Sequence, residues 1–429
     1  MKRKCYPKYK PSGVEWLGDV PEHWEVKRLK CCLLLCTKKA VTDENPIALE
    51  NIESRTGRFI ETESEFEGDG IRFNSGDILF GKLRPYLAKV YLAEKAGESI
   101  GDIFVLRPTS EVLCKYAAAI LRTDNYIEII DGSTYGSKMP RASWEFMCNL
   151  PFPLPPLPEQ QAIAAFLDRE TGRIDALLGK QQKLVALLKE KRTALISRAV
   201  TKGLDASVKL KPSGVDWLGE VPEHWEVMPL KRIVSIPITD GPHETPEIFD
   251  EGIPFVSAEA IRNNKIDFER KRGFISESEH IRFSLKYHPK RDDIYMIKSG
   301  ATTGNLAIVE TDDEFNIWSP LAVIRVYIKK ANARFILSSM NSKEFQTSVQ
   351  LFWSYGTQQN IGMNVIENLQ VTLPPLSEQQ AIAAFLDRET TKIDSLIAKV
   401  DTTIEKLKEY RTALISAAVT GKIDLREAV

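Results

Sequence analysis

The chain has 429 residues, of which 43% are hydrophobic and 27% charged, and its formal net charge is −1 at pH 7. This length predicts two to four domains, and the balanced charge argues against indiscriminate electrostatic binding of nucleic acid, although it leaves room for a local basic face. No signal peptide is recognisable, and the apolar run CCLLLC at 31–36 is far too short to span a bilayer. We therefore expect a cytoplasmic protein.

Two segments of the chain occur twice. Residues 11–30, PSGVEWLGDVPEHWEVKRLK, return at 212–231 with 16 of the 20 aligned positions identical. Residues 154–205 begin LPPLPEQQAIAAFLDRETGRID and return at 373–424 with 34 of 52 positions identical. Because these repeats frame unlike inserts, they predict one scaffold that recognises two different things.

The inserts, 31–153 and 232–372, show no obvious similarity to each other. Each contains short runs of β-branched and aromatic residues between turn residues, which is typical of strands, followed by amphipathic helices and polar loops. The expected strands are 76–80, 88–93, 102–108, 292–298, 305–310 and 321–328; the expected helices are 111–130 and 332–349; the loops are 133–143 and 354–362.

The second repeated segment predicts a long helix in each half. The stretch from Glu159 to Val200 has no proline, and its length of roughly 42 residues corresponds to about 63 Å of helix. One alternative is that each helix only covers its own domain, but 63 Å exceeds the width of a small domain. We therefore expect the two helices to pair antiparallel about a pseudo-twofold axis. The seven-residue ladders of the predicted coiled-coil seam are Leu167, Ile174, Gln181, Leu188, Leu195 and Leu386, Ile393, Val400, Leu407, Leu414.

The sequence contains no catalytic constellation that we recognise. The patterns G-x-x-x-x-G-K-[ST], G-x-S-x-G and H-E-x-x-H are all missing, so we expect no catalytic residues. His23 and His224 lie in the repeated PEHWEV segment, where a structural role beside the adjacent tryptophans is favoured. All six cysteines precede residue 149 without C-x-x-C spacing, which predicts reduced thiols and no metal site.

Both repeated segments, together with GDILFGKLRPYL at 76–87 and GTQQNI at 356–361, resemble type I restriction–modification specificity subunits over essentially the whole chain. The resemblance implies an α+β fold with two globular β-rich target-recognition domains, separated by two long antiparallel coiled-coil helices in a pseudo-twofold internal repeat. The implied segments are a first recognition domain at 1–153, a central helix at 154–205, a second recognition domain at 206–372 and a C-terminal helix at 373–429.

The same resemblance implies the partners. Each domain would read one half of a split double-stranded DNA sequence, and the helices would set the gap and dock two methyltransferase subunits. Endonuclease/translocase subunits would join for cleavage. S-adenosylmethionine, ATP and Mg are then expected on the partner subunits, with no cofactor on this chain and no membrane contact. Two alternatives stay open: a recognition subunit of a methylation-only or other defence system, and a coiled-coil scaffold that does not bind DNA.

Candidate DNA-binding residues follow from the chemistry of base edges, which Arg, Asn and Gln read through paired hydrogen bonds. The loop at 133–143 lacks the G-T-Q-x-N form of 356–360, so the sequence does not establish equivalent contacts in the two domains. Ten bases within 262–298 predict either a local basic face or a solvated charged surface. The candidates on polar loops are Lys138, Arg141, Gln358, Gln359 and Asn360, and those at strand ends are Lys82, Arg84, Lys298, Thr302 and Thr303.

Overall fold

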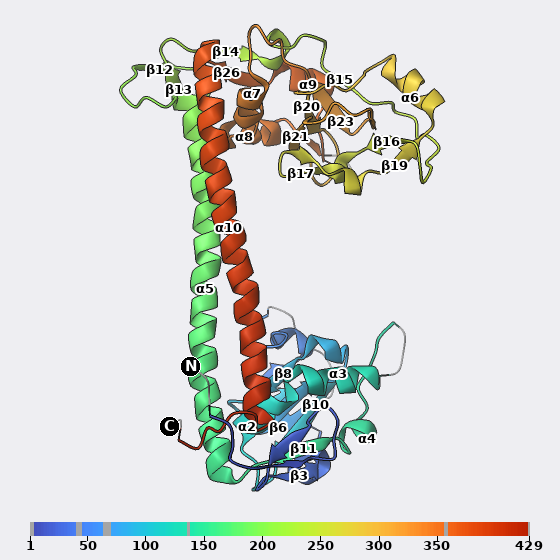
Figure 1. Cartoon of the computed structure of the whole chain (residues 1–429), viewed down its shortest axis with the longest axis vertical. Coiled ribbons are helices and arrows are strands. Elements are labelled where there is room, and N and C mark those ends of the chain that lie inside the picture. The colour runs from blue at the N-terminus through green and yellow to red at the C-terminus, as the bar shows by residue number, and fades with distance from the viewer. Residues whose placement is uncertain (1–3, 40–44, 63–69, 135–137, 356–358, 428–429) are drawn as a thin grey trace. The chain divides into compact units, whose positions relative to one another are not determined.

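The computed structural model describes residues 4–39, 45–62, 70–134, 138–355 and 359–427. The chain forms two compact units, Met1–Gln182 with Asp401–Val429, and Lys183–Val400. Each unit contains one insert and about half of each long helix. The boundaries between the units therefore lie within the helices, not at the segment boundaries drawn from the sequence. Figure 1 shows the elements of each unit in the colours of the chain.

The insert of the first unit is closed at its base by the repeated frame. Strand β1 (Tyr9–Pro11) pairs antiparallel with β2 (Asp19–Pro21). The strand that precedes the insert, β3 (Glu25–Arg28), pairs antiparallel with the strand at the end of the insert, β11 (Pro151–Leu154). The two ends of the insert therefore leave the frame side by side.

Within the first insert, a four-stranded antiparallel sheet forms the core. Its order is β4 (Leu33–Cys36), β10 (Ile103–Pro108), β7 (Ile78–Gly81) and β8 (Val90–Leu92). All four residues of β7 are buried, as the apolar run at 76–80 predicts for a central strand. The remaining elements are α1 (Leu29–Cys32), β5 (Pro46–Ile47), β6 (Ile71–Phe73), β9 (Gly97–Ser99), α2 (Cys114–Leu121), α3 (Asp124–Gly132) and α4 (Trp144–Met147).

The second unit repeats this plan. Strands β14 (Glu226–Pro229) and β26 (Gln370–Leu373) close the insert, and β15 (Thr239–Asp240), β23 (Leu321–Ile324), β20 (Ile294–Ile297) and β21 (Leu306–Ile308) form a four-stranded sheet in that order. The predicted strands and helices are thus found in both inserts. The other elements are β12 (Leu210–Pro212), β13 (Glu220–Pro222), β16 (Ile253–Val256), β17 (Ile261–Arg262), β18 (Lys265–Ile266), β19 (Gly273–Ile275), α6 (Glu277–Ser284), β22 (Asn316–Ile317), α7 (Ala333–Met340), α8 (Lys343–Leu351), β24 (Ser354–Tyr355), β25 (Gln359–Asn360) and α9 (Met363–Asn368).

The two long helices are α5 (Leu157–Lys202), of 46 residues, and α10 (Leu376–Val419), of 44 residues. Each follows a proline pair that cannot continue a helix, and each is slightly longer than predicted. Among the described residues, none of the helices combines the length and apolar character needed to span a membrane.

The pairing of α5 with α10 is marked by the same ion pair formed twice. In the first unit Arg411 contacts Asp175, with Nε 2.9 Å from Oδ1. In the second unit Arg192 contacts Asp394, also at 2.9 Å. A shift of 219 residues converts Asp175 into Asp394 and Arg192 into Arg411. The two contacts are thus one interaction with the helices exchanged, which is the antiparallel, pseudo-twofold pairing that the sequence predicts.

The start of each long helix is fastened to the repeated PEHW segment of its own unit. The Glu159 carboxylate lies 2.8 Å from Nε2 of His23 and also accepts a hydrogen bond from the Tyr6 hydroxyl. In the second unit, Glu378 lies 2.9 Å from Nε2 of His224 and accepts from the Trp225 indole N–H at 3.1 Å. Both histidines therefore have the structural role that the sequence favours.

The next residue of each helix, Gln160 or Gln379, is fully buried and clamps the loop before a domain helix. The Gln160 side chain accepts from the Leu113 N–H at 2.7 Å and donates to the Glu111 carbonyl at 2.9 Å. Gln379 makes the matching contacts with the Asn332 N–H and the Lys330 carbonyl. The repeated EQQ sequence thus joins each domain to its helix.

Candidate nucleic-acid interface

The predicted residues of the first domain come from two segments that backbone hydrogen bonds bring together. The Lys82 N–H, just beyond β7, donates to the Asp102 carbonyl at 2.7 Å, and the Lys82 carbonyl accepts from the Ala142 N–H at 2.9 Å. The Arg84 N–H donates to the Pro140 carbonyl at 2.8 Å. The strand end with Lys82 and Arg84 therefore shares one surface with the loop that carries Lys138 and Arg141.

The side chains on this surface differ in how they are held. Asp102 accepts two hydrogen bonds from the Arg141 guanidinium, at 2.9 and 3.2 Å, and Arg141 remains 46% exposed. Burial lowers the pKa of Lys82, with Arg141 acting in the same direction and Asp102 against it, and the ammonium lies 5.0 Å from the centroid of the Phe104 ring. Arg84 and Lys138 are exposed. The Arg141 guanidinium is thus held in place by Asp102 while almost half of the side chain remains exposed.

The predicted residues of the second domain are brought together by matching bonds. The Lys298 N–H, just beyond β20, donates to the Pro320 carbonyl at 2.8 Å, and the Lys298 carbonyl accepts from the Ile361 N–H at 2.9 Å. The Gln359 carbonyl accepts from the Gly300 N–H at 3.0 Å. The loop after β20 and the loop that ends in Asn360 therefore form one surface.

These two surfaces have the same backbone construction. Leu83 pairs with Arg141 in an antiparallel bridge, and Ser299 pairs with Asn360 in the equivalent bridge. Lys82 and Lys298 make equivalent hydrogen bonds through their backbone N–H and carbonyl groups. Their carbonyls accept from Ala142 and Ile361, so the preceding residues, Arg141 and Asn360, occupy equivalent positions. The equivalence that the first loop's sequence did not establish is present in its backbone.

A buried carboxylate organises the second surface. Asp240 lies 3.1 Å from the Lys298 ammonium and 2.6 Å from that of Lys286, and its side chain is 9% exposed. Burial acts to raise the pKa of Asp240, but hydrogen bonds and charge from Lys286 and Lys298 outweigh it, so the net pKa lies below the usual value. The sequence marks residues 239–244 as a loop of the kind that often carries recognition, but Asp240 itself is not among the predicted DNA-binding residues.

The remaining candidates fall into different environments. Thr302 and Asn360 are exposed, and Gln359 is partly buried. Thr303 is 7% exposed, and its hydroxyl donates to the Gly300 carbonyl at 2.7 Å, which favours a role in holding the loop. Gln358 lies outside the described residues. The contacts of all these side chains with DNA stay predictions.

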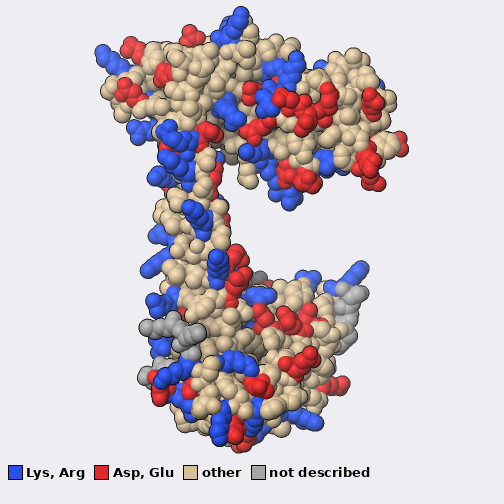
Figure 2. Space-filling view, in the orientation of Figure 1, with Lys and Arg blue, Asp and Glu red and all other residues tan. Residues whose placement is uncertain are grey.

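Most of the ten bases within 262–298 are neutralised by acids from elsewhere in the same unit. Lys265 pairs with Glu310 at 3.1 Å, Arg282 with Glu244 at 2.6 Å, and Arg291 with Asp312. Figure 2 accordingly shows Lys and Arg intermixed with Asp and Glu on the second unit. The solvated charged surface is therefore the better interpretation of this run.

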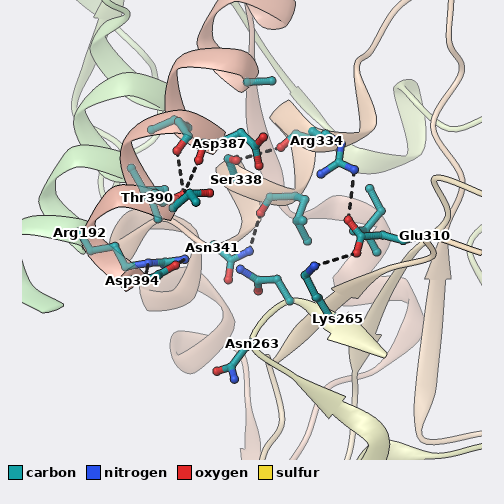
Figure 3. Close-up of a pocket in the computed structure, with 17 residues that line it drawn as sticks. Arg192, Asn263, Lys265, Glu310, Arg334, Ser338, Asn341, Asp387, Thr390 and Asp394 are labelled. Carbon is teal, nitrogen blue, oxygen red and sulfur yellow. Dashed lines mark hydrogen bonds and ion pairs between the residues drawn. The ribbon is translucent and has the colours of Figure 1, made fainter. Parts of the chain in front are cut away.

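A cavity of about 210 Å³ lies in the second unit where its domain meets α5 and α10. Figure 3 shows Lys265 and Arg334 both directed at Glu310, with each nitrogen 3.1 Å from a carboxylate oxygen. Burial acts to raise the pKa of Glu310, but these two partners outweigh it and the net pKa is lowered. Lys265 and Arg334 are neutralised by Glu310, and Arg192 by Asp394, which suits a domain–helix junction better than a ligand site.

The duplicated frame thus presents two polar loop surfaces with the same backbone construction. The family model described as "Type I restriction modification DNA specificity domain" matches residues 50–185 and 222–406. Because that match covers most of the chain and both of its halves, the protein belongs to the family of type I restriction–modification specificity subunits.

Individual relatives agree with this assignment. The chain is 24% identical to a putative type I restriction enzyme MjaX specificity subunit of Methanocaldococcus jannaschii, over 96% of each chain. It is 23% identical to the EcoBI specificity subunit of Escherichia coli, over 70% of this chain and 64% of that one.

Solved structures share the fold. A chain from a study titled "Structural basis underlying complex assembly and conformational transition of the type I R-M system" matches with a TM-score of 0.72 and 18% identity, covering 93% of this chain and 98% of that chain. The HsdS subunit from Thermoanaerobacter tengcongensis matches with a TM-score of 0.52 and 18% identity, covering 94% and 98%.

Proposed function

We propose that this chain is the non-catalytic DNA-recognition subunit of a type I restriction–modification complex, and that each domain reads one half of a split double-stranded sequence. The observation that carries the proposal is the loop surface built twice on one backbone pattern, with Arg141 in one domain and Asn360 in the other. Two readers with different side chains at equivalent positions would recognise different base pairs.

The side chains suit this task. A guanidinium donates two parallel hydrogen bonds to guanine, and an Asn or Gln amide pairs with adenine. Arg141 is steadied by Asp102 and would enter a groove with its orientation already set. Arg84 and Lys138, both exposed, would contact phosphate, which fixes register without reading sequence.

The helices would set the gap between the half-sequences and dock two methyltransferase subunits. Support for docking comes from large apolar side chains that α5 and α10 expose among charged neighbours: Leu177 at 40%, Leu184 at 42%, Leu187 at 51% and Leu396 at 48%. S-adenosylmethionine, ATP and Mg would be bound by the partner subunits, endonuclease/translocase subunits would join for cleavage, and the complex would act in the cytoplasm.

Competition gel shifts test the proposal. The full chain, assembled with its methyltransferase subunits, should retain a labelled duplex that contains the target when random duplex is added in excess, and should release it to unlabelled target. Equal competition by every duplex would favour the scaffold alternative. A complex that binds and methylates its target but never assembles with cleavage subunits would identify the methylation-only alternative.

A further inference from the structure

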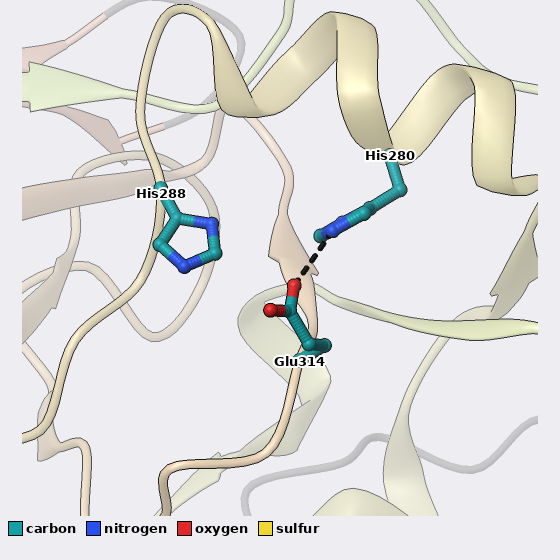
Figure 4. Close-up of side chains that lie close together, drawn as sticks. All are labelled: His280, His288 and Glu314. Atoms are coloured by element: carbon teal, nitrogen blue, oxygen red, sulfur yellow. Dashed lines mark ion pairs between the residues drawn. The ribbon is translucent and has the colours of Figure 1, made fainter.

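Three side chains in the second unit, none of them a predicted DNA-binding residue, converge on one another. Figure 4 shows His280 from α6, His288 from the loop after α6 and Glu314 from the segment before β22. One donor atom of each lies within 4.8 Å of the donor atoms of the other two. Two imidazoles and a carboxylate at this separation can surround one cation.

The His280 ring is oriented as a metal-binding histidine is. Its Nδ1 lies 2.6 Å from Oδ1 of Asn316, whose own amide nitrogen donates to the Ser284 hydroxyl at 3.4 Å. Asn316 is 2% exposed, so this acceptor is fixed in the interior. Because Nδ1 donates to Asn316, Nε2 is the ring atom left for a cation, and it lies 2.7 Å from Oε2 of Glu314, so a proton or a cation must stand between these two atoms. Such hydrogen bonding of the second ring nitrogen is usual for histidine ligands.

The backbone around the other two donors is also held. The His288 carbonyl accepts a hydrogen bond from the Arg325 guanidinium at 2.7 Å, and Arg325 is in turn paired with the buried Asp293 at 2.6 Å. Glu314 lies two residues before Asn316, the first residue of β22, which pairs with β16. The segments that carry these donors are therefore held by the fold, and a cavity of about 360 Å³ lies beside His288 and Glu314.

We infer that His280, His288 and Glu314 form a binding site for a divalent transition-metal ion of the Zn²⁺ class. Imidazole ligands select Zn²⁺ and its neighbours, whereas Mg²⁺ and Ca²⁺ take oxygen ligands almost exclusively. Three protein ligands leave one tetrahedral position for water. A bound ion would tie α6 to the strand β22. The cysteine spacing predicts no metal site on this chain, and these three residues would be an exception to that prediction.

The competing explanation is a plain ion pair between His280 and Glu314, which needs neither a metal nor His288. Titration of the chelator-treated full chain with Zn²⁺ separates the two. His288→Ala should remove one equivalent of bound Zn²⁺, and so should Glu314→Gln; both side chains are exposed, so neither change disturbs the core. His243→Ala is the matched control, since that ring is 71% exposed in the same domain and lies outside the cluster.

Because exposed thiols such as Cys5 and Cys31 can also take up added zinc, the readout is the difference between variants, together with the absorption spectrum of the Co²⁺ form. The equivalent that His288→Ala removes should show tetrahedral bands without a thiolate charge-transfer band. Asn316→Ala, checked for folding by circular dichroism, should lower the affinity for this Zn²⁺ ion by about 10–100-fold, because it removes the hydrogen-bond partner of His280 Nδ1. Unchanged Zn²⁺ stoichiometry in both His288→Ala and Glu314→Gln would overturn the inference.

Discussion

The loop surfaces of the two domains share a backbone and differ in chemistry. In the first domain the residue that accepts from the Lys82 N–H is Asp102, whose carboxylate also holds Arg141. In the second domain the equivalent acceptor is Pro320, which has no charge, and the Asp240 carboxylate on β15 holds Lys298 instead. The backbone is thus common to both surfaces, whereas the nearby acid pairs with Arg141 in the first domain and with Lys298 in the second.

The two copies of the helix ion pair differ in a similar way. Asp175 and Arg411 are 16% and 18% exposed, and Asp175 also pairs with Arg58 of the first insert at 2.6 Å. Asp394 and Arg192 are 51% and 30% exposed. The same contact is therefore more deeply buried in the first unit, and it also connects the domain to the helices there.

Lengthening both helices equally should have the largest effect on the recognised sequence. An insertion of four residues between Leu184 and Leu188, matched by one between Thr403 and Leu407, adds about 6 Å of helix. If the helices set the gap, both half-sequences should persist while the gap grows by one or two base pairs, since DNA rises about 3.4 Å per pair. Mapping of methylated adenines measures the gap, and an active complex with the original gap would show that the helices do not set it.

Removal of one reading side chain should weaken one half-site only. Arg141→Ala should cost about 1–3 kcal/mol of binding free energy on the intact target and should relax discrimination at one base pair of the first half-sequence. Asn360→Ala is the matched variant for the second half-sequence. Binding is measured with duplexes altered in one half at a time, and a variant that loses discrimination in both halves would contradict independent reading.

The helix ion pairs should differ in their contribution to stability. Arg411→Ala should lower the free energy of unfolding by about 1 kcal/mol or more, because it leaves the largely buried Asp175 with fewer partners. Arg192→Ala should cost only a few tenths of a kcal/mol, as is usual for an exposed pair. Denaturant unfolding measures both variants, and equal losses of unfolding free energy would contradict the predicted difference between the two ion pairs.

The smallest expected effect is on how the folding stability of the second unit depends on pH. The pKa of Asp240 is lower in the folded chain than its ordinary value of 3.8, so the stabilisation it gives is complete above that value and is lost as the pH falls through the folded pKa. Asp240→Asn should therefore lower the stability of the second unit near neutral pH and flatten its decline under acid. A variant whose acid unfolding curve overlies that of the parent chain would show that Lys286 and Lys298 gain nothing from Asp240.

Much of this architecture follows from sequence because it depends on repeated patterns. The ladders containing Ile174 and Ile393 predict paired helices, since an apolar stripe that long requires a partner. The equivalence of Arg141 and Asn360 could not be found this way, because backbone hydrogen bonds impose no residue type. The cluster of His280, His288 and Glu314 also escaped notice, since its members come from separate elements at no motif spacing.

The central claim is that each domain reads its half of the target independently, and exchange of one insert tests it most directly. Residues 31–153 would be replaced by the corresponding insert of a relative, with the repeated frame and residues 232–372 left intact. Methylated adenines would then be mapped across the genome of a strain that carries the chimera with its methyltransferase subunits. We predict that one half of the methylated sequence changes while the other half and the gap persist; a change in both halves would contradict the account.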